Sequence, residues 1–152
     1  MKTEGMIIVV DDDESVRKAL ERLIKSLGIE VKTFASATDY LNYGDLENVI
    51  CLILDIRMPG MTGLDLQKHL VHTDSQIPII FITAHEDENV RKKGLKGGAL
   101  AYLYKPFEDE VLIKAIHAAL ERASYRSSGR TPPAARAVRP PGPPGPERPN
   151  PQ

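Results

Sequence analysis

Four unbroken apolar runs stand out along the first part of the chain. They are Met6–Val10, Cys51–Leu54, Ile79–Ile82 and Ala101–Tyr104, and Val31–Phe34 is a weaker fifth. Runs without polar alternation are typical of strands that are covered on both faces, as in parallel sheets. We therefore predict a strand at each of the five positions.

The stretches between these runs carry apolar residues at helical spacing. One apolar stripe runs from Val16 to Leu27 and is followed by Gly28, a residue that commonly ends a helix, and another runs from Val111 to Leu120. Shorter helices are predicted over residues 38–43, 64–73 and 87–95. Strands that alternate with helices predict an α/β fold, a doubly wound five-stranded parallel sheet with right-handed crossovers.

The composition changes near Tyr125. Three prolines precede this residue and nine follow it, together with Gly, Ala and Arg. Such a segment buries too little apolar surface to offset the entropy lost on ordering it. We expect a folded domain over residues 5–124 and a disordered Pro/Arg-rich tail over residues 125–152. An inert tail is the preferred interpretation, and a proline-rich ligand for a partner domain is the alternative.

Charge is divided unevenly between these two parts. The net charge is −1, but residues 126–152 carry +4, which leaves −5 on the rest. An acidic body argues against nucleic-acid binding by the folded part. The tail arginines permit weak, salt-sensitive contact with DNA. No recognition helix is visible, so we expect no direct DNA binding by this chain.

Localisation follows from two further features. No apolar run approaches the roughly 20 residues that a membrane span needs. The single cysteine, Cys51, opens an apolar run and is typical of a reduced core residue. We expect a cytoplasmic protein without a membrane partner.

Polar residues follow four of the predicted strands. Asp11 and Asp12 come after the first strand, Asp55 after the third, Thr83 after the fourth and Lys105 after the fifth. The carboxyl ends of parallel strands line one edge of a sheet, and ligands bind there where the strand order reverses. With the flavodoxin-like order 2-1-3-4-5, the first and third strands are neighbours, and Asp12 would face Asp55.

Each of these residues also has an ordinary structural interpretation. An Asp-Asp-Asp-Glu run is typical of a helix cap, which we favour for Asp13 and Glu14. Asp55 could begin a turn, Thr83 could cap a helix, and Lys105 could be a surface lysine. Turn chemistry alone, however, does not explain three carboxylates, a hydroxyl and an ammonium group at one sheet edge.

The combination of these groups favours phosphoryl chemistry. Crowded carboxylates repel one another, and the pKa of one would rise unless a cation neutralised them. Oxygen ligands with room for water favour Mg²⁺. In such a site Asp55 is suited to take a phosphoryl group as a nucleophile. Lys105 would offset the charge of that group, and the Thr83 hydroxyl would hydrogen-bond one of its oxygens.

At these residues the chain resembles the receiver domains of two-component response regulators, over about residues 5–124. The motifs are Val9–Asp13, Leu54–Gly60, Ile82–Ala84 and Lys105–Phe107. Each motif is weak alone, but the four in this order are specific. The Asp-Ile-Arg-Met-Pro-Gly stretch is most similar to receivers that carry a C-terminal helix-turn-helix. That likeness implies transcriptional regulation as the output of an intact parent protein.

The resemblance implies a role for each acidic residue. Asp55 would be the phosphoacceptor. Mg²⁺ would be bound by Asp12, Asp55 and the backbone carbonyl of Arg57, and Asp11 would act mostly through water. The phosphoryl donor would be a phosphohistidine on a sensor histidine kinase.

The resemblance also implies a switch. Thr83 and Lys105 would contact the phosphoryl group, and the bond between Lys105 and Pro106 would be cis. Tyr102 would be the switch aromatic that swings inward as Thr83 moves; the alternative is ordinary half-buried packing. The output face would consist of helix 4, strand 5 and helix 5, which would dock a partner or form a homodimer.

Two positions depart from the common pattern of the family. Ala101 and Thr62 stand where many members have acids, and both lie outside the predicted acidic pocket.

One alternative function is a receiver fold that works unphosphorylated as a protein-interaction module. Another is a haloacid-dehalogenase-like phosphatase, but Arg57 occupies the place of that family's second Asp. We therefore expect no enzyme beyond self-catalysed phosphorylation and dephosphorylation.

Overall fold

The computed structural model describes residues 5–44, 47–73 and 76–128. Five parallel strands form one sheet in the order β2-β1-β3-β4-β5. Their bounds are β1 Met6–Val10, β2 Glu30–Phe34, β3 Val49–Asp55, β4 Ile79–Thr83 and β5 Ala101–Tyr104. The predicted doubly wound α/β fold of flavodoxin-like order is confirmed.

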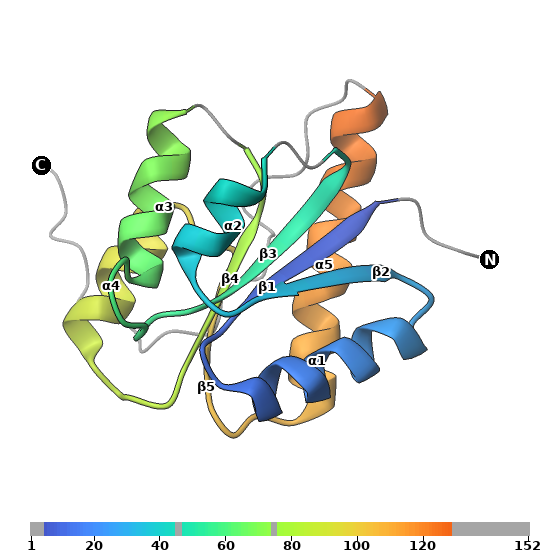
Figure 1. The fold of residues 1–152 in the computed structure, drawn as a ribbon. Coiled ribbons are helices and arrows are strands. Elements are labelled where there is room, and N and C mark those ends of the chain that lie inside the picture. The colour runs from blue at the N-terminus through green and yellow to red at the C-terminus, as the bar shows by residue number, and fades with distance from the viewer. Residues whose placement is uncertain (1–4, 45–46, 74–75, 129–152) are drawn as a thin grey trace, which may run out of the picture.

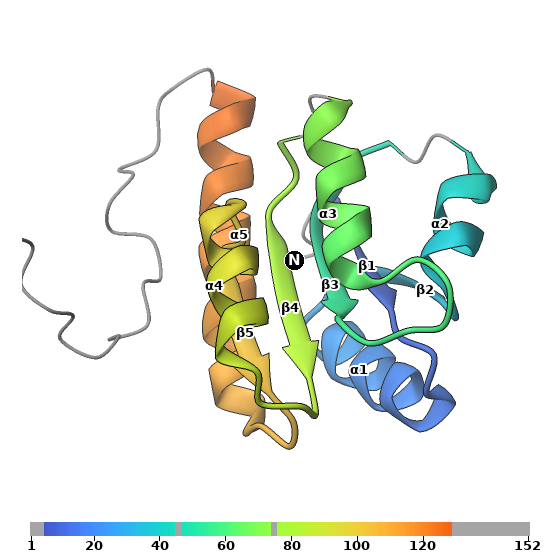
Figure 2. The same cartoon turned by 90° about the vertical axis from the view of Figure 1, so that its left-hand side faces the viewer.

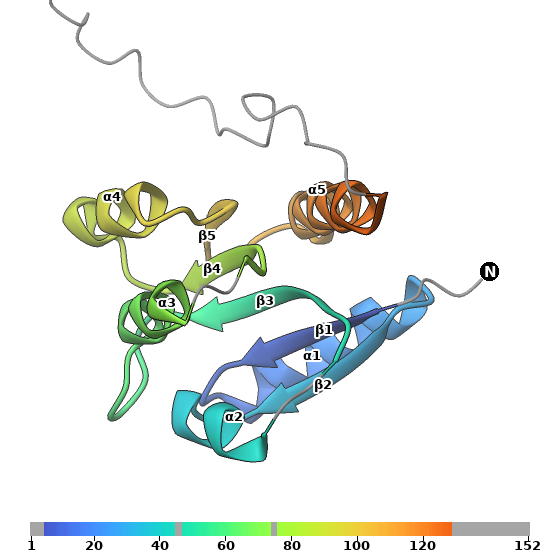
Figure 3. The ribbon, with the colours of Figure 1, turned by 90° about the horizontal axis from the view of Figure 1, so that it is seen from above.

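Helices cover both faces of this sheet. Their bounds are α1 Glu14–Ser26, α2 Ala37–Tyr43, α3 Gly63–His72, α4 Glu88–Lys96 and α5 Asp109–Ser128. Helices α1 and α5 lie on one face, and α2, α3 and α4 lie on the other (Figure 1, Figure 3). Along the chain, one helix connects each strand to the next.

Burial on both faces explains the unbroken apolar runs. Along β1, Ile7 and Val9 pack with the α1 and α5 side, whereas Ile8 and Val10 pack with the α2, α3 and α4 side. All four side chains are fully buried. Burying one such side chain stabilises the fold by roughly 1.5–3 kcal/mol, so neither face of β1 tolerates a polar alternation.

Local chemistry determines both ends of α1. The Asp13 carboxylate accepts hydrogen bonds from the N–H groups of Ser15 and Val16, at 2.8 and 3.4 Å, which confirms the predicted cap. Gly28 lies just beyond the helix with a φ of 79°, and its N–H donates to the Lys25 carbonyl at 2.9 Å. A positive φ favours glycine at such a C-terminal turn.

Helix α5 is longer than the sequence pattern indicated. It extends to Ser128, whereas the predicted boundary between domain and tail fell at residues 124 and 125. Residues 125–128 contain no proline, and the first proline of the tail is Pro132, so the backbone can continue its hydrogen bonding past that boundary. The rest of the predicted tail, residues 129–152, lies outside the described residues. Among the helices described, none has the length and apolarity to cross a membrane.

Candidate functional site

The carboxyl ends of the strands meet at one edge of the sheet, and the arrows of β3 and β4 point toward it (Figure 2). Asp55 and Thr83 are the last residues of β3 and β4. Asp11 directly follows β1, and Lys105 directly follows β5. The Lys105 N–H donates to the Thr83 carbonyl at 2.7 Å. The predicted residues therefore share this edge.

Three carboxylates converge there. Asp11, Asp12 and Asp55 each offer one carboxylate oxygen, and these oxygens lie within 4.8 Å of one another. We call these three residues the acid cluster. Asp11 is fully buried, Asp55 is 5% exposed, and Asp12 is exposed to solvent. The cluster is thus open to the outside on the Asp12 side.

Lys105 is the cation of the acid cluster. Its Nζ lies 2.9 Å from Oδ2 of Asp11 and 3.8 Å from Oδ2 of Asp55. The shorter contact is a charge-assisted hydrogen bond. The other carboxylate oxygen of Asp11 accepts a hydrogen bond from the Asp13 N–H at 2.9 Å. Both oxygens of Asp11 therefore have partners, whereas no described residue donates a hydrogen bond to the Asp12 carboxylate.

The environment raises the pKa of Asp55 to about 7. Burial is the largest cause and repulsion from Asp11 the next; Lys105 opposes them, and Asp12 adds to the rise. One lysine does not balance three acids. A hard cation that accepts only oxygen ligands would supply the missing charge, so the donor set fits Mg²⁺.

The backbone after Asp55 is held by close packing. The Ile56 N–H donates to the Ile82 carbonyl at 3.1 Å, and the Ile56 carbonyl accepts from the Gly63 N–H at 3.0 Å. A Cβ atom on Gly63 would lie 2.5 Å from the Asp55 carbonyl oxygen. Glycine at the start of α3 therefore allows the loop to close. The Arg57 side chain is exposed, and the role of its carbonyl as a metal ligand stays a prediction.

Thr83 lies beneath the same edge. Its side chain is 1% exposed, and its Oγ1 accepts a hydrogen bond from the His85 N–H at 3.1 Å. Just after β5, the peptide bond between Lys105 and Pro106 is cis, as predicted. The hydroxyl of Thr83 is thus engaged with the β4–α4 loop, which connects the site to α4.

Tyr102 is buried, not half-buried as the alternative interpretation of this residue assumed. It is 7% exposed, and its ring centroid lies 6.0 Å from that of Phe81 and 5.5 Å from that of Tyr104. Its hydroxyl is buried without a hydrogen-bond partner among the described residues. Burial is the main cause that raises the pKa of Tyr102 to about 12. The side chain points inward here, and its role as a switch stays a prediction.

One contact of the acid cluster has no counterpart in the predictions from sequence. Nη1 of Arg17 donates a hydrogen bond to the backbone carbonyl of Asp11 at 2.7 Å. Arg17 lies on α1 between Val16 and Lys18, outside the apolar stripe that predicts the helix. The linear pattern therefore gave no sign of this hydrogen bond.

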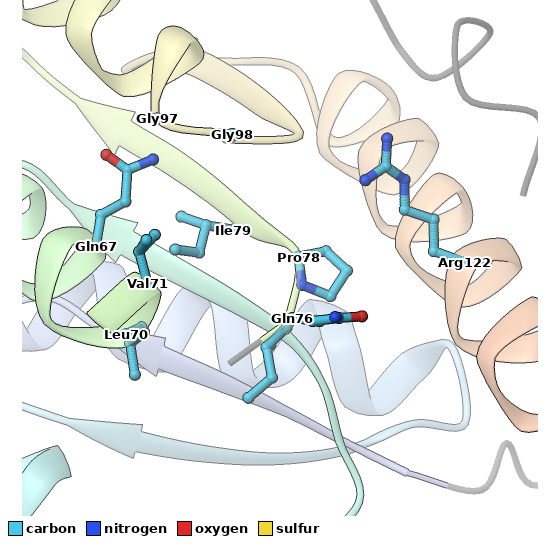
Figure 4. A pocket seen from close by; sticks show the side chains of 10 residues that line it. Gln67, Leu70, Val71, Gln76, Pro78, Ile79, Gly97, Gly98 and Arg122 are labelled. Carbon is cyan, nitrogen blue, oxygen red and sulfur yellow. The ribbon is translucent and has the colours of Figure 1, made fainter. Parts of the chain in front are cut away.

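A cavity of about 340 Å³ lies between α3, the start of β4 and the turn after α4 (Figure 4). Its lining includes Ile79, the first residue of β4, Pro78 just before it, and Gly97 just after α4. These residues belong to the amino ends of the strands, opposite the acid cluster. Gln67 of α3 borders the cavity, and its amide donates to the Gly94 carbonyl at 2.9 Å.

Comparison with known families agrees with this geometry. The family model of the response regulator receiver domain matches residues 7–117 of the sequence. The chain belongs to this family. The acid cluster, Lys105 and Thr83 all lie within the matched residues.

Curated relatives and solved structures extend the match. The chain is 48% identical over 120 residues to the response regulator protein TmoT of Ectopseudomonas mendocina, covering 79% of this chain and 54% of TmoT. It is 37% identical over 123 residues to the transcriptional regulatory protein FixJ of Bradyrhizobium diazoefficiens, covering 81% of this chain and 60% of FixJ. The chain thus spans little more than half the length of these relatives.

Among solved structures, the response regulator StyR matches with a TM-score of 0.76 and 43% identity, over 82% of this chain and 63% of StyR. The FixJ-N structure matches with a TM-score of 0.72 and 39% identity, over 78% of this chain and 94% of that chain. The receiver domain therefore shares its fold and much of its sequence with both.

Proposed function

We propose that this receiver domain accepts a phosphoryl group on Asp55 in a Mg²⁺-dependent step. The observation that carries the proposal is the convergence of Asp11, Asp12 and Asp55 within 4.8 Å beside Lys105. A carboxylate oxygen of Asp55 forms the new bond to phosphorus as the bond between phosphorus and the donor breaks. The bonding electron pair leaves with the donor, so the product is an acyl phosphate.

The residues around Asp55 are suited to this transfer. Asp12 and Asp55, with the backbone carbonyl of Arg57, would hold the metal, and Asp11 would act through water. When bound, Mg²⁺ supplies the positive charge that keeps Asp55 ionised and offsets the charge of the phosphoryl oxygens. Lys105, already 3.8 Å from Asp55, would shift toward the transferred group and pair with one of its oxygens.

The phosphoryl donor in this proposal is a phosphohistidine on a sensor histidine kinase. The output passes through α4, β5 and α5, where the receiver docks a partner or forms a homodimer. Support comes from the burial of Tyr102 beside Phe81 of β4 and from the engagement of the Thr83 hydroxyl with the loop that precedes α4. In an intact parent protein, we propose that this change regulates transcription.

The proposal assigns no external substrate to this chain. The catalytic contribution of Lys105 and Thr83 is limited to phosphorylation and dephosphorylation of Asp55 itself. Arg57, two positions after Asp55, carries a guanidinium that stays protonated, so it cannot act as the general acid that a carboxylic acid provides in a phosphatase of the aspartyl-phosphate type.

The test is to mix the protein with acetyl phosphate and Mg²⁺ and to follow its intact mass. We expect the wild type to gain one phosphoryl group that hydroxylamine removes. Asp55→Asn should gain none, and chelation of the metal should stop labelling of the wild type. The matched control is Asp39→Asn, which changes an exposed acid on α2 and should label normally.

Two outcomes contradict the proposal. Labelling of Asp55→Asn at the wild-type level would move the acceptor elsewhere. A wild type that neither labels nor binds Mg²⁺ would favour a receiver fold that works unphosphorylated as an interaction module.

A further inference from the structure

Asp11, the residue directly after β1, forms hydrogen bonds with several parts of the fold. The Asp11 N–H donates to the Phe34 carbonyl of β2 at 3.1 Å. The Asp11 carboxylate accepts from Lys105 and from the Asp13 N–H, each at 2.9 Å. Its backbone carbonyl accepts from Nη1 of Arg17 at 2.7 Å. Every polar atom of Asp11 therefore has a partner.

Asp12, by contrast, is held only through its backbone neighbours. Its side chain is exposed, and no described residue donates a hydrogen bond to its carboxylate. The carbonyl of Asp11 and the N–H of Asp12 belong to one planar peptide unit. A hydrogen bond to that carbonyl therefore also restricts the direction in which the Cα and carboxylate of Asp12 point.

We infer that Arg17 is a positioning residue of the metal site: its guanidinium, through the Asp11 carbonyl, fixes the Asp11–Asp12 peptide and so aims the Asp12 carboxylate into the acid cluster. This inference rests on the proposed function, because it concerns the affinity of the same site for Mg²⁺. Arg17 forms no hydrogen bond or ion pair with the three carboxylates; its hydrogen bond is to the backbone carbonyl of Asp11. Arg17 therefore acts on the orientation of Asp12 through the Asp11 backbone carbonyl.

Simple electrostatics predicts the opposite effect of removing Arg17. A guanidinium near a cation site repels the cation, so losing its charge should tighten Mg²⁺ binding. Positioning predicts weaker binding, because a mobile Asp12 must be ordered when the ion binds. The direction of the change therefore separates the two effects.

The experiment measures Mg²⁺ binding to the wild type and to Arg17→Met by titration calorimetry in the absence of a phosphodonor. Methionine keeps an apolar stem on α1 but removes the charge and the donors. We expect the dissociation constant to rise about tenfold, the change typical of losing one hydrogen bond from a charged group. Arg22→Met is the matched control: Arg22 is an exposed arginine on the same helix, and its loss should leave binding within about twofold.

A second measurement separates positioning from a general structural role. The initial rate of labelling by acetyl phosphate is followed against Mg²⁺ concentration. For Arg17→Met we expect the half-maximal Mg²⁺ concentration to rise about tenfold while the rate at saturating Mg²⁺ stays within about twofold of wild type. A loss confined to the saturated rate would overturn the inference.

The remaining outcomes also decide the question. Unchanged or tighter Mg²⁺ binding by folded Arg17→Met overturns the positioning role and leaves the proposed function intact. If Arg17→Met does not fold, Arg17→Lys carries the test; about threefold weaker binding is expected, since a lysine keeps the charge but not the guanidinium fork. Wild-type affinity in Arg17→Lys would then overturn the inference. A wild type that binds no Mg²⁺ overturns the proposed function together with it.

Discussion

Lys105 and Asp11 form a hydrogen-bonded ion pair of 2.9 Å between residues 94 positions apart in the chain. Asp11 is fully buried, and 19% of the Lys105 side chain is exposed. A buried carboxylate that loses its cation is left without compensation, which is costly in a protein interior. The pair therefore connects the stability of the fold with the charge of the acid cluster.

Replacing Lys105 by methionine should lower the free energy of unfolding by about 3 kcal/mol at pH 8 without metal. Urea denaturation measures the change. Lys18→Met is the matched control, because Lys18 pairs with Glu14 at 3.4 Å on the exposed surface of α1. That loss should cost less than about 1 kcal/mol. Equal costs for the two variants would show that the pair of Lys105 and Asp11 is not effectively buried.

Asp55→Asn should stabilise the metal-free protein in a pH-dependent way. The folded-state pKa of Asp55, raised to about 7 from 3.8, means that the native state holds this proton more tightly than the unfolded chain does. Stability therefore falls as pH rises from about 4 to about 7, and the loss is complete above that window. Asparagine cannot ionise, so we expect a gain of about 1–3 kcal/mol at pH 8 and little change near pH 4.

Thermal or urea denaturation across this pH range measures the effect. Glu30→Gln removes a carboxylate from the exposed start of β2 and is the control for net charge. A gain of the same size at pH 4 and pH 8 would show that Asp55 does not titrate as described.

Gly63→Ala should destabilise the protein although alanine favours helices. In an unconstrained helix position the change would stabilise by about 0.5–1 kcal/mol. Here the new Cβ would lie 2.5 Å from the Asp55 carbonyl oxygen, and backbone there cannot move without moving Asp55. We expect a loss of about 1–3 kcal/mol, measured by urea denaturation. Gly97→Ala should cost less, since its Cβ would meet a side chain, the Gln67 amide at 2.7 Å, rather than backbone; the reverse order would contradict this expectation.

Tyr102→Phe should leave the protein as stable as the wild type or more so. The Tyr102 hydroxyl is buried without a partner in the described part of the chain, so its removal relieves a desolvation cost of about 1 kcal/mol. Differential scanning calorimetry measures the change as a higher Tm. Tyr104→Phe, on a partly exposed ring of the same strand, should change Tm little. A clear fall in Tm for Tyr102→Phe would mean that the hydroxyl finds a partner in solution.

The sequence predicted the sheet and the acid cluster because both follow from simple positional rules. Strands such as Ile79–Ile82 are apolar throughout because helices cover both faces. Asp55, Thr83 and Lys105 each end or follow a strand, and parallel strands bring such residues to one edge. Only the order of the strands had to be inferred in addition.

Contacts that depend on the direction of a side chain could not be predicted from the sequence. Arg17 lies six positions from the Asp11 carbonyl it binds, and the contact joins α1 to the residue after β1, so neither the helical nor the strand period predicts it. The depth at which Tyr102 is buried depends on how closely α4 packs, and α4 approaches Phe81 through Gly94, where a Cβ would lie 3.0 Å from the ring. The predicted boundary between domain and tail, at residues 124 and 125, lies inside α5 because the composition changes before the first helix-breaking proline.

The distance along the chain between Asp11 and Lys105 has a consequence for the order of events during synthesis. A nascent chain that has emerged only as far as β4 carries all three acids but not the lysine that offsets them. Closing so long a loop comes late in folding, after local helices have formed. The acid cluster therefore gains the partial charge compensation of Lys105 only when the last strand is in place, and an incompletely folded chain lacks the charge pattern of the finished domain.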